Sequence, residues 1–444
     1  MRVGYQETPP YELSFQGGDE TGERFSQVSL PDKAARTLTF LCRAADIAKI
    51  FLGPPKSWIL FRENPRGPLQ RYNRQILSSL KDPKKKSRFH TLNNGLSIVC
   101  NKYTLTEDKK GVKIEGMRIV NGCQTTVTLA KAVEDKLLDD TVLIFVRLTE
   151  TTDTNYRKQI AEANNTQRAV RSVDLASLQD ELRHYHQLFE NLRPNPYFLE
   201  VQAGDWEYMT SRDDKRRFEQ PYIEREALAQ AVLAFQNKPS EAMEERRYIF
   251  QRKTGPEGDP RGHFEDVFGR GLIAEQLLLP WLVMKKVGLK IEEAENERRE
   301  MEAQGKEITP LHHPENVRYS RLHRTWLVGQ ILGLVFNVDF SSSDLDRSDA
   351  KKLCKKIDDY FDALYEVVDE TIYEAMELIS GRMGDEFEAR KVFRLSHSTF
   401  MPTAAPRPFV PRSIFQERLR IILGRQNRLR QIKELLQSAA VASE

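Results

Sequence analysis

Residues 111–150, GVKIEGMRIVNGCQTTVTLAKAVEDKLLDDTVLIFVRLTE, determine the fold class of this 444-residue chain. The first ten are rich in β-forming residues, and Asn121-Gly122 follows them where the chain can turn through a positive φ angle. Residues 123–137 have helical character despite their threonines, and residues 140–150 have the apolar pattern of a buried strand. A strand, a tight turn, a helix and a second strand form a crossover unit, which implies at least one parallel pair of strands.

The segments on either side of this unit extend the sheet. Residues 96–105, LSIVCNKYTL, are β-rich and are separated from 111–120 only by a short polar stretch, so the two should pair as a hairpin. Nearer the N-terminus, 31–52 has apolar residues at helical spacing, 57–64 (SWILFREN) has the pattern of a strand, and 69–80 that of a helix. From Asp153 onward the pattern is mostly helical.

The expected fold class is therefore α+β: a mixed β-sheet core, made of the hairpin and the crossover, followed by a largely α-helical C-terminal half. We expect four segments. They are an N-terminal arm and lead-in helix (1–44), an α+β core (45–175), a helical extension (176–270) and a helical C-terminal domain (271–444).

Composition narrows the class of protein. Hydrophobic residues make up 39% and charged residues 30%, which is typical of a soluble globular protein. No apolar run is long enough to span a bilayer and no secretory signal follows Met1, so we expect a cytoplasmic protein with no membrane partner. The four cysteines form no CxxC pair, which argues against a zinc ribbon or a disulfide framework. They should be reduced and mostly buried.

Charge is unevenly distributed although the net charge is only +3. Residues 62–90 hold nine Lys or Arg against Glu63 and Asp82, and residues 405–444 hold eight against three acidic residues. Two basic stretches in a nearly neutral chain are a common electrostatic feature of phosphate-binding proteins. Each stretch taken alone is equally compatible with a solvated helix face.

Side-chain amides gather at the ends of the predicted core elements. Amides both donate and accept hydrogen bonds, so a pocket that they line suits a base, a ribose or a phosphate ester. The turn at Asn121-Gly122 also opens a helix, whose first N–H groups, with Thr125 and Thr126, favour an anion. The simpler interpretation is that these residues are turns and helix caps. The amides are Asn93, Asn94, Asn121, Gln124, Asn164, Asn165 and Gln167.

The order of these segments resembles the AIPR family, which is named for abortive infection phage resistance. The matching stretches are RENPRG, NNGLSIVCNKY, RIVNGCQTT, VRLTE, IAEANNTQRAVRSVDL and LAQAVLAFQNKPSEA, which together span roughly residues 45–270. Cys123 departs from the family, which often has glutamine there. The resemblance implies bacterial antiviral defence, with a core distantly like the ParB/sulfiredoxin fold, whose members bind nucleotides at the corresponding turn.

Catalytic groups are less evident. Longer AIPR proteins often carry a restriction-endonuclease-like domain ahead of this region, and we find no equivalent acidic and Gln-x-Lys set here. Whether the chain is an enzyme is therefore uncertain, and a nuclease activity would need a partner or an unrelated site. A metal such as Mg²⁺ would need carboxylates. The weak candidates are Asp153, Glu162 and Asp174, of which Asp153 and Asp174 are more simply helix caps.

Three hypotheses follow. The first is a defence protein that senses or binds nucleic acid, DNA or RNA, or a nucleotide, at an amide-rich, basic face. The second is a metal-dependent nuclease or NTP-hydrolysing enzyme that uses the same pocket. The third is a helical scaffold that docks other defence subunits or a second copy of the chain. The predicted binding residues are Arg62, Arg66, Arg88, Asn93, Asn94, Gly95, Asn121, Gly122, Gln124, Thr125, Asn164, Asn165, Gln167, Arg168 and Arg171.

Overall fold

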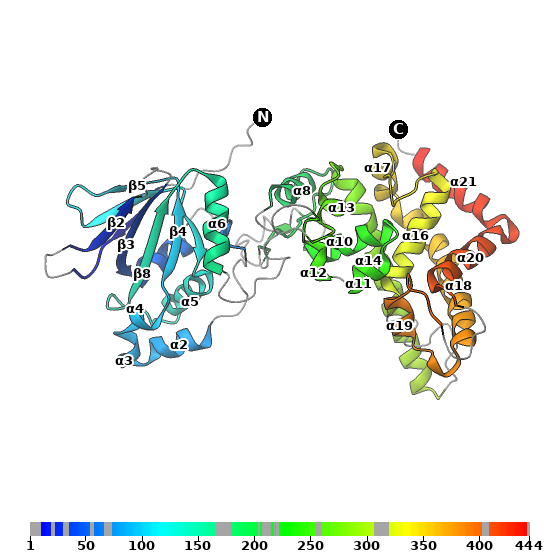
Figure 1. The fold of residues 1–444 in the computed structure, drawn as a ribbon, viewed down its shortest axis with the longest axis horizontal. Coiled ribbons are helices and arrows are strands. Elements are labelled where there is room, and N and C mark those ends of the chain that lie inside the picture. Colours follow the sequence, from blue (N-terminus) through cyan, green and yellow to red (C-terminus); the bar gives the residue numbers. More distant parts are fainter. Residues whose placement is uncertain are drawn as a thin grey trace. The chain divides into compact units, whose positions relative to one another are not determined.

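The computed structural model of the chain contains two compact units, residues 1–222 and residues 223–444. The first holds the β-strands and the second is helical (Figure 1). This arrangement confirms the α+β fold class. The structure describes residues 10–18, 23–29, 35–53, 57–65, 73–165, 179–202, 205–206, 215–216, 218, 222–244, 246–253, 259–305, 319–401 and 408–441.

The main sheet of the first unit has five described strands in the order β2-β3-β8-β4-β7. The strand β8 is antiparallel to β3 and parallel to β4, which pairs Leu96 with Val146. The predicted parallel pair therefore exists and joins β4 to β8, with β7 antiparallel to β4 on the far side. The strands are β2 (Phe25–Ser29), β3 (Arg36–Arg43), β4 (Leu96–Cys100), β7 (Arg118–Asn121) and β8 (Leu143–Glu150).

The predicted hairpin of residues 96–120 is present but divided between two sheets. Its outer part, β4 with β7, belongs to the main sheet, and its tip, β5 with β6, belongs to a three-stranded sheet in the order β1-β6-β5. A long hairpin that bends in this way can place one half on each side of a core. The strands of the small sheet are β1 (Tyr11–Ser14), β5 (Lys102–Leu105) and β6 (Gly111–Glu115).

Two expectations for the N-terminal region are wrong. Residues 36–43 form the strand β3 rather than a helix. Leu38, Phe40 and Cys42 are buried and the residues between them are half-exposed, which is the two-residue period of a strand. The helix expected there begins only at α1 (Ala44–Leu52). The strand expected at residues 57–64 is absent, and a 3₁₀ helix, η1 (Ser57–Phe61), begins there instead.

Helices cover the two faces of the main sheet unequally. Apolar residues of α1 and of α5 (Cys123–Glu134) share one core with the inward faces of both sheets. On the other face, α6 (Thr154–Asn165) packs Ala161 against Val99 of β4 and Val120 of β7. In Figure 1 no described helix crosses in front of β2, β3 and β8 on that side. The remaining described helices of this unit are α2 (Arg74–Lys81), α3 (Pro83–Lys86), α4 (Phe89–Leu92) and α8 (Asp180–Glu190).

The second unit is built from helices that pack around α16 (Arg321–Phe336), most of whose residues are buried. The highly charged segment after Ile291 continues the long helix α14 (Ala274–Ala303) on the surface. The others are α10 (Arg225–Phe235), α11 (Pro239–Glu244), α12 (Arg246–Ile249), α13 (Phe264–Phe268), α17 (Arg347–Lys355), α18 (Ile357–Met383), η4 (Gly384–Glu386), α19 (Ala389–Arg394), α20 (Pro411–Gly424), η5 (Arg425–Asn427) and α21 (Arg428–Val441).

The four cysteines are free thiols. Cys42, Cys100 and Cys123 are buried in the first unit, and Cys354 is partly buried in the second. Burial raises the pKa of the Cys100 thiol to about 12 and raises the pKa of Cys123 well above its usual range. The expectation of mostly buried cysteines is confirmed. Among the described segments, no helix has both the length and the apolar character needed to cross a membrane.

A buried histidine lies in the core of the second unit. His323 has no exposed surface, and its Nε2 lies 2.8 Å from Ser396 Oγ, which in turn lies 2.6 Å from Ser240 Oγ. The rings of Trp326, Phe393 and Phe415 surround it. Burial, with smaller effects of Arg412 and His397, lowers the pKa of His323 to about 3, so this ring is neutral in the folded protein.

We predict that acid destabilises the second unit through His323. Its pKa is lower in the folded than in the unfolded chain, so its contribution is complete above about pH 6.5 and is lost as the pH falls toward 3, by up to about 1.4 kcal/mol per pH unit. His323→Gln should reduce this slope when thermal unfolding is followed by tryptophan fluorescence between about pH 7 and pH 5. The exposed His184 provides a control, His184→Gln, which should leave the slope unchanged. An unaltered slope in His323→Gln would contradict the assignment.

Candidate functional site

The two asparagine-glycine turns of the core lie against each other. A Cβ atom added to Gly122 would lie 2.3 Å from Cδ2 of Leu96 and 3.0 Å from the carbonyl oxygen of Gly95. Gly122 also has a φ angle of +98°. Glycine is therefore required by both conformation and space. The turn that precedes β4 and the turn that opens α5 form one continuous surface element.

The C-terminus of α6 joins this element through Asn164. Its backbone carbonyl accepts a hydrogen bond from the Asn121 side chain at 2.5 Å, and its side-chain oxygen accepts one from Ser97 at 3.0 Å. Ser97 and Asn121 are themselves partners in the β4–β7 pairing. The three predicted motifs, NNG, VNG and ANN, are thus brought together, and we call Ser97, Asn121 and Asn164 the amide cluster.

Asn165 has a structural role, because its side chain satisfies buried backbone carbonyl groups. Its side chain is buried and donates to the carbonyl oxygens of Val120 (2.8 Å) and Ala161 (2.7 Å). The same Val120 oxygen accepts a hydrogen bond from the buried side chain of Asn64 at 2.9 Å. Both amides tie other elements to β7. The simpler interpretation from the sequence, that such residues cap and connect, describes Asn165 best.

The other predicted amides divide between the turn and the surface. The Asn93 side chain accepts a hydrogen bond from the Gly95 N–H at 3.0 Å, which stabilises the turn. Asn94 is exposed, and Gln124 is half-buried. Of the predicted amides in the described segments, Asn94 therefore has the most exposed position. Gln167 lies outside the described residues.

The N-terminus of α5 is less open than the sequence suggested. Cys123, Thr125 and Thr126 are all buried, and the Thr126 hydroxyl donates to the Gly122 carbonyl oxygen at 3.1 Å. The Thr126 side chain therefore stabilises the turn and does not face solvent. Only Gly122 and Gln124 of the first turn are partly exposed. This position alone offers little to an anion.

The carboxylate candidates do not form a metal centre in the described part of the chain. Asp153 accepts hydrogen bonds from the backbone N–H groups of Asn155 (2.8 Å) and Tyr156 (3.2 Å), so it caps α6. Glu162 is half-buried on α6, and Asp174 lies outside the described residues. No group of three His, Cys, Asp or Glu among the described residues could hold a metal ion.

The two basic stretches differ in the ion pairs that their cations form. In the C-terminal stretch, three cations pair with acidic residues of α18: Arg425 lies 2.7 Å from Glu370 and 2.6 Å from Glu374, Arg428 also pairs with Glu370, and Arg418 lies 3.8 Å from Glu374. The exposed cations described in the N-terminal stretch have no such acidic partners. We call its exposed cations the basic face, and in the described chain none of them forms an ion pair. They are Arg74, Lys81, Lys84, Lys85 and Arg88.

Arg62, another predicted cation, does not belong to this face. Arg62 is half-buried, and its backbone carbonyl accepts hydrogen bonds from Gln202 (3.0 Å) and Arg183 (2.9 Å). Its neighbour Glu63 pairs with Arg157 of α6 at 2.9 Å, so this motif connects η1 to α6. Arg66, Arg168 and Arg171 lie outside the described residues.

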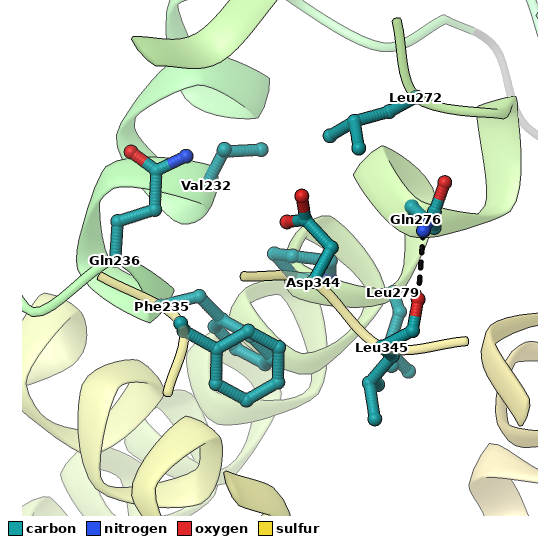
Figure 2. Close-up of a pocket in the computed structure, with 10 residues that line it drawn as sticks. Val232, Phe235, Gln236, Leu272, Gln276, Leu279, Asp344 and Leu345 are labelled. Atoms are coloured by element: carbon teal, nitrogen blue, oxygen red, sulfur yellow. Dashed lines mark hydrogen bonds between the residues drawn. The ribbon is translucent and has the colours of Figure 1, made fainter. Parts of the chain in front are cut away.

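Two cavities lined by described residues lie away from the amide cluster. One cavity in the second unit, of about 20 Å³, has space for about one water molecule. Figure 2 shows the carboxylate of Asp344 among its lining residues, and burial raises the pKa of this group despite its ion pair with Arg270 at 2.7 Å. A hollow of about 450 Å³ in the first unit is bordered by Arg36 and Glu150, which pair at 2.6 Å. Neither offers an unpaired charge to a phosphate.

Two exposed side chains of β8 were not predicted. Phe145 is 37% exposed, and Arg147, two residues further on the same face, is also exposed. The run TVLIFVRL has the pattern of a fully buried strand, but the arginine in its middle is a signal that one face is open. Phe145 lies beside Gly95, whose added Cβ would lie 3.1 Å from the Phe145 Cβ.

Comparison with known proteins agrees with this set of motifs. The model of the family described as AIPR protein matches residues 61–395. The chain belongs to the AIPR family. Membership indicates a role in abortive-infection defence against phage, as the sequence resemblance implied. No curated protein and no solved structure matches the chain. The proposed likeness of the AIPR core to the ParB/sulfiredoxin fold stays a prediction.

We predict that the AIPR asparagine Asn165 stabilises the fold, whereas Asn94 does not. Asn165→Ala removes two buried hydrogen bonds and should lower the free energy of unfolding by about 1–3 kcal/mol. Asn94→Ala changes an exposed turn residue and should alter stability by less than about 0.5 kcal/mol. Urea unfolding followed by circular dichroism measures both. If Asn165→Ala keeps full stability, its role is in a ligand site and not in the core.

Proposed function

We propose that this AIPR protein is a nucleic-acid-binding component of an abortive-infection defence system and that the basic face of α2, α3 and α4 contacts the phosphate backbone. The observation that carries the proposal is the set of exposed cations without acidic partners. Residues 73–92 contain six Lys or Arg and a single acidic residue, Asp82. Only Lys86 is neutralised by an ion pair, with Asp139 at 2.5 Å.

The short helices display these cations in a defined geometry. The Asn73 side chain accepts hydrogen bonds from Gln75 and Ile76 and so caps α2, and Asp82 caps α3 through the N–H groups of Lys84 and Lys85. Asp82 is thereby engaged with the backbone. Buried Leu80 and Phe89 attach this segment to the core on either side of the lysines. The cations therefore project from a supported surface.

The distribution of charge favours a polyanion over a small anion. A single phosphate is usually held by convergent donors in a pocket, whereas these cations lie along three successive helices on the surface. A nucleic acid presents a row of phosphates, and each contact with Lys or Arg releases a counterion. Because the whole chain has a net charge of only +3, the local excess would also orient the approach of nucleic acid.

Nucleic-acid binding is compatible with a role in abortive-infection defence. A component that recognises nucleic acid could supply the sensing step of an abortive-infection response, and partner subunits could supply a catalytic step. The hypotheses of a metal-dependent enzyme and of a helical scaffold have no comparable observation in their favour among the described residues.

We predict that removing two cations weakens binding in a salt-dependent way. For a labelled DNA duplex, Lys84→Ala with Lys85→Ala should reduce the slope of log affinity against log salt by about 1.8, since each phosphate contact contributes about 0.9. Fluorescence anisotropy at several salt concentrations gives this slope. Thermal stability should be unchanged because both side chains are exposed.

A matched control uses lysines of the same unit that lie outside the basic face. Lys109 and Lys110 are exposed in the turn between β5 and β6, and the pair Lys109→Ala with Lys110→Ala should leave the slope unchanged. An equal loss in both double variants would indicate a general charge effect. Binding that is absent in the wild-type protein, or that does not depend on salt, rules out the proposal.

A further inference from the structure

On one face of the main sheet, no described helix covers β2, β3 and β8, and we call this side the open face (Figure 1). Across this face, Phe145 pairs in register with Leu41, and Arg147 pairs with Thr39 on one side and Ser97 on the other. Leu41, Thr39 and Ser97 are half-buried, while Phe145 and Arg147 are exposed. The open face therefore combines an aromatic ring, a guanidinium and hydroxyl groups.

Phe145 has an unusual position for an aromatic residue of a central strand. On the opposite side of the same strand, Ile144 and Val146 are fully buried in the core, so the Phe145 ring is not needed there. Gly95, with a φ angle of +74°, lies beside the Phe145 Cβ and has no side chain of its own to cover the ring. An exposed ring of this kind can stack on a nucleobase.

Arg147 complements the ring. It makes no ion pair with any described residue, and its register neighbour Ser97 belongs to the amide cluster. A guanidinium can contact a phosphate or stack on a base, and the adjacent amide and hydroxyl groups can hydrogen-bond to base edges. The open face thus has each type of group that binds unpaired nucleotides.

The open face is also continuous with the basic face. The helix α4 ends at Leu92, and Asn93, Asn94 and Gly95 lead directly into β4 beside Phe145. Figure 1 shows α2, α3 and α4 together at the end of the sheet where β4 begins. A strand of nucleic acid that contacts Arg88 can therefore reach Phe145 past the exposed side chain of Asn94.

We propose that AIPR residues Phe145 and Arg147 bind the bases of single-stranded nucleic acid, so that the protein prefers single strands to duplexes. This inference rests on the proposed function, because the basic face supplies the contacts with phosphate. A duplex keeps its bases stacked inside the helix, where Phe145 could not reach them. A single strand can place its backbone along the basic face and turn its bases toward the sheet.

The composition of the open face favours this partner over another protein. Its described side chains include the hydroxyls of Thr37 and Thr39 and the charge of Arg147, with Val28 and Phe145 as the exposed apolar members. Protein interfaces usually exclude charge from their centre and gather larger apolar areas there. The unpaired positive charge beside the ring instead matches a polyanion that carries bases.

The test compares a labelled oligothymidylate and oligouridylate of about 20 nucleotides with a DNA duplex of the same length, using fluorescence anisotropy. The wild-type protein should bind at least one of the single strands more tightly than the duplex. Phe145→Leu keeps an apolar side chain but removes the aromatic ring, and it should weaken single-strand binding about 5- to 100-fold. Duplex binding should change less than about twofold.

Three further variants define the cause. Phe145→Tyr retains the ring and should bind single strands within about twofold of the wild type. Arg147→Gln should weaken single-strand binding and reduce the salt slope by about 0.7. Leu334→Ala removes an exposed apolar side chain from α16 of the second unit and should have no effect on either ligand. All variants should keep the melting temperature of the wild type.

The outcomes separate this inference from the proposed function. If the wild type binds neither ligand, both are wrong. If Lys84→Ala with Lys85→Ala weakens binding but Phe145→Leu does not, the basic face binds nucleic acid and the inference about the open face is wrong. The same conclusion holds if Phe145→Leu and Phe145→Tyr weaken binding equally. If Phe145→Leu instead changes the molecular mass in solution without altering binding, the open face contacts a second copy of the chain.

Discussion

The first unit depends on the carbonyl oxygen of Val120, which accepts hydrogen bonds from the side chains of Asn64 and Asn165. An edge strand leaves backbone groups without partners, and when these groups are buried they must be satisfied by side chains. Here two amides, from segments 56 and 45 residues away, meet at one acceptor. This contact fixes η1 and α6 against β7. It therefore sets the position of the α6 C-terminus, where Asn164 joins the two glycine turns.

The fold class was predictable because the pattern of residues 96–150 is regular. The β-rich hairpin, the turn at Gly122 and the helix α5 all follow from local preferences, and so does the helical second half. The strand β3 was not predictable in the same way, since alanines on either side of RTLTFLC lend the region helical spacing. Its conformation is decided by pairing with β8, a segment more than a hundred residues later. Long-range pairing of this kind is not encoded in a local window.

The candidate site was predicted in part. Sequence order alone identified the NNG, VNG and ANN motifs, and the structure brings them together. The order of residues could not distinguish an amide that faces a ligand from one that donates a hydrogen bond to a buried backbone carbonyl, because both roles require the same side chain. Phe145 lies inside an apolar run with the pattern of a buried strand, and in the sequence only Arg147 signals an open face. Among the described helices, α6 packs on β4 and β7 and leaves the Phe145 side chain exposed. The two basic stretches look alike in the sequence. In the structure, three cations of the C-terminal stretch pair with acidic residues of α18, whereas the exposed cations described in the N-terminal stretch have no acidic partner.

The burial of the cysteines has a practical consequence for chemistry on this protein. A thiol reacts as the thiolate, and the raised pKa values of Cys100 and Cys123 keep these groups protonated and enclosed. Cys42 is likewise fully buried. The native first unit should thus be nearly silent toward alkylating reagents. A single cysteine introduced at the exposed position 94 would then be a selective attachment point for a fluorophore or a crosslinker, placed between the basic face and the open sheet.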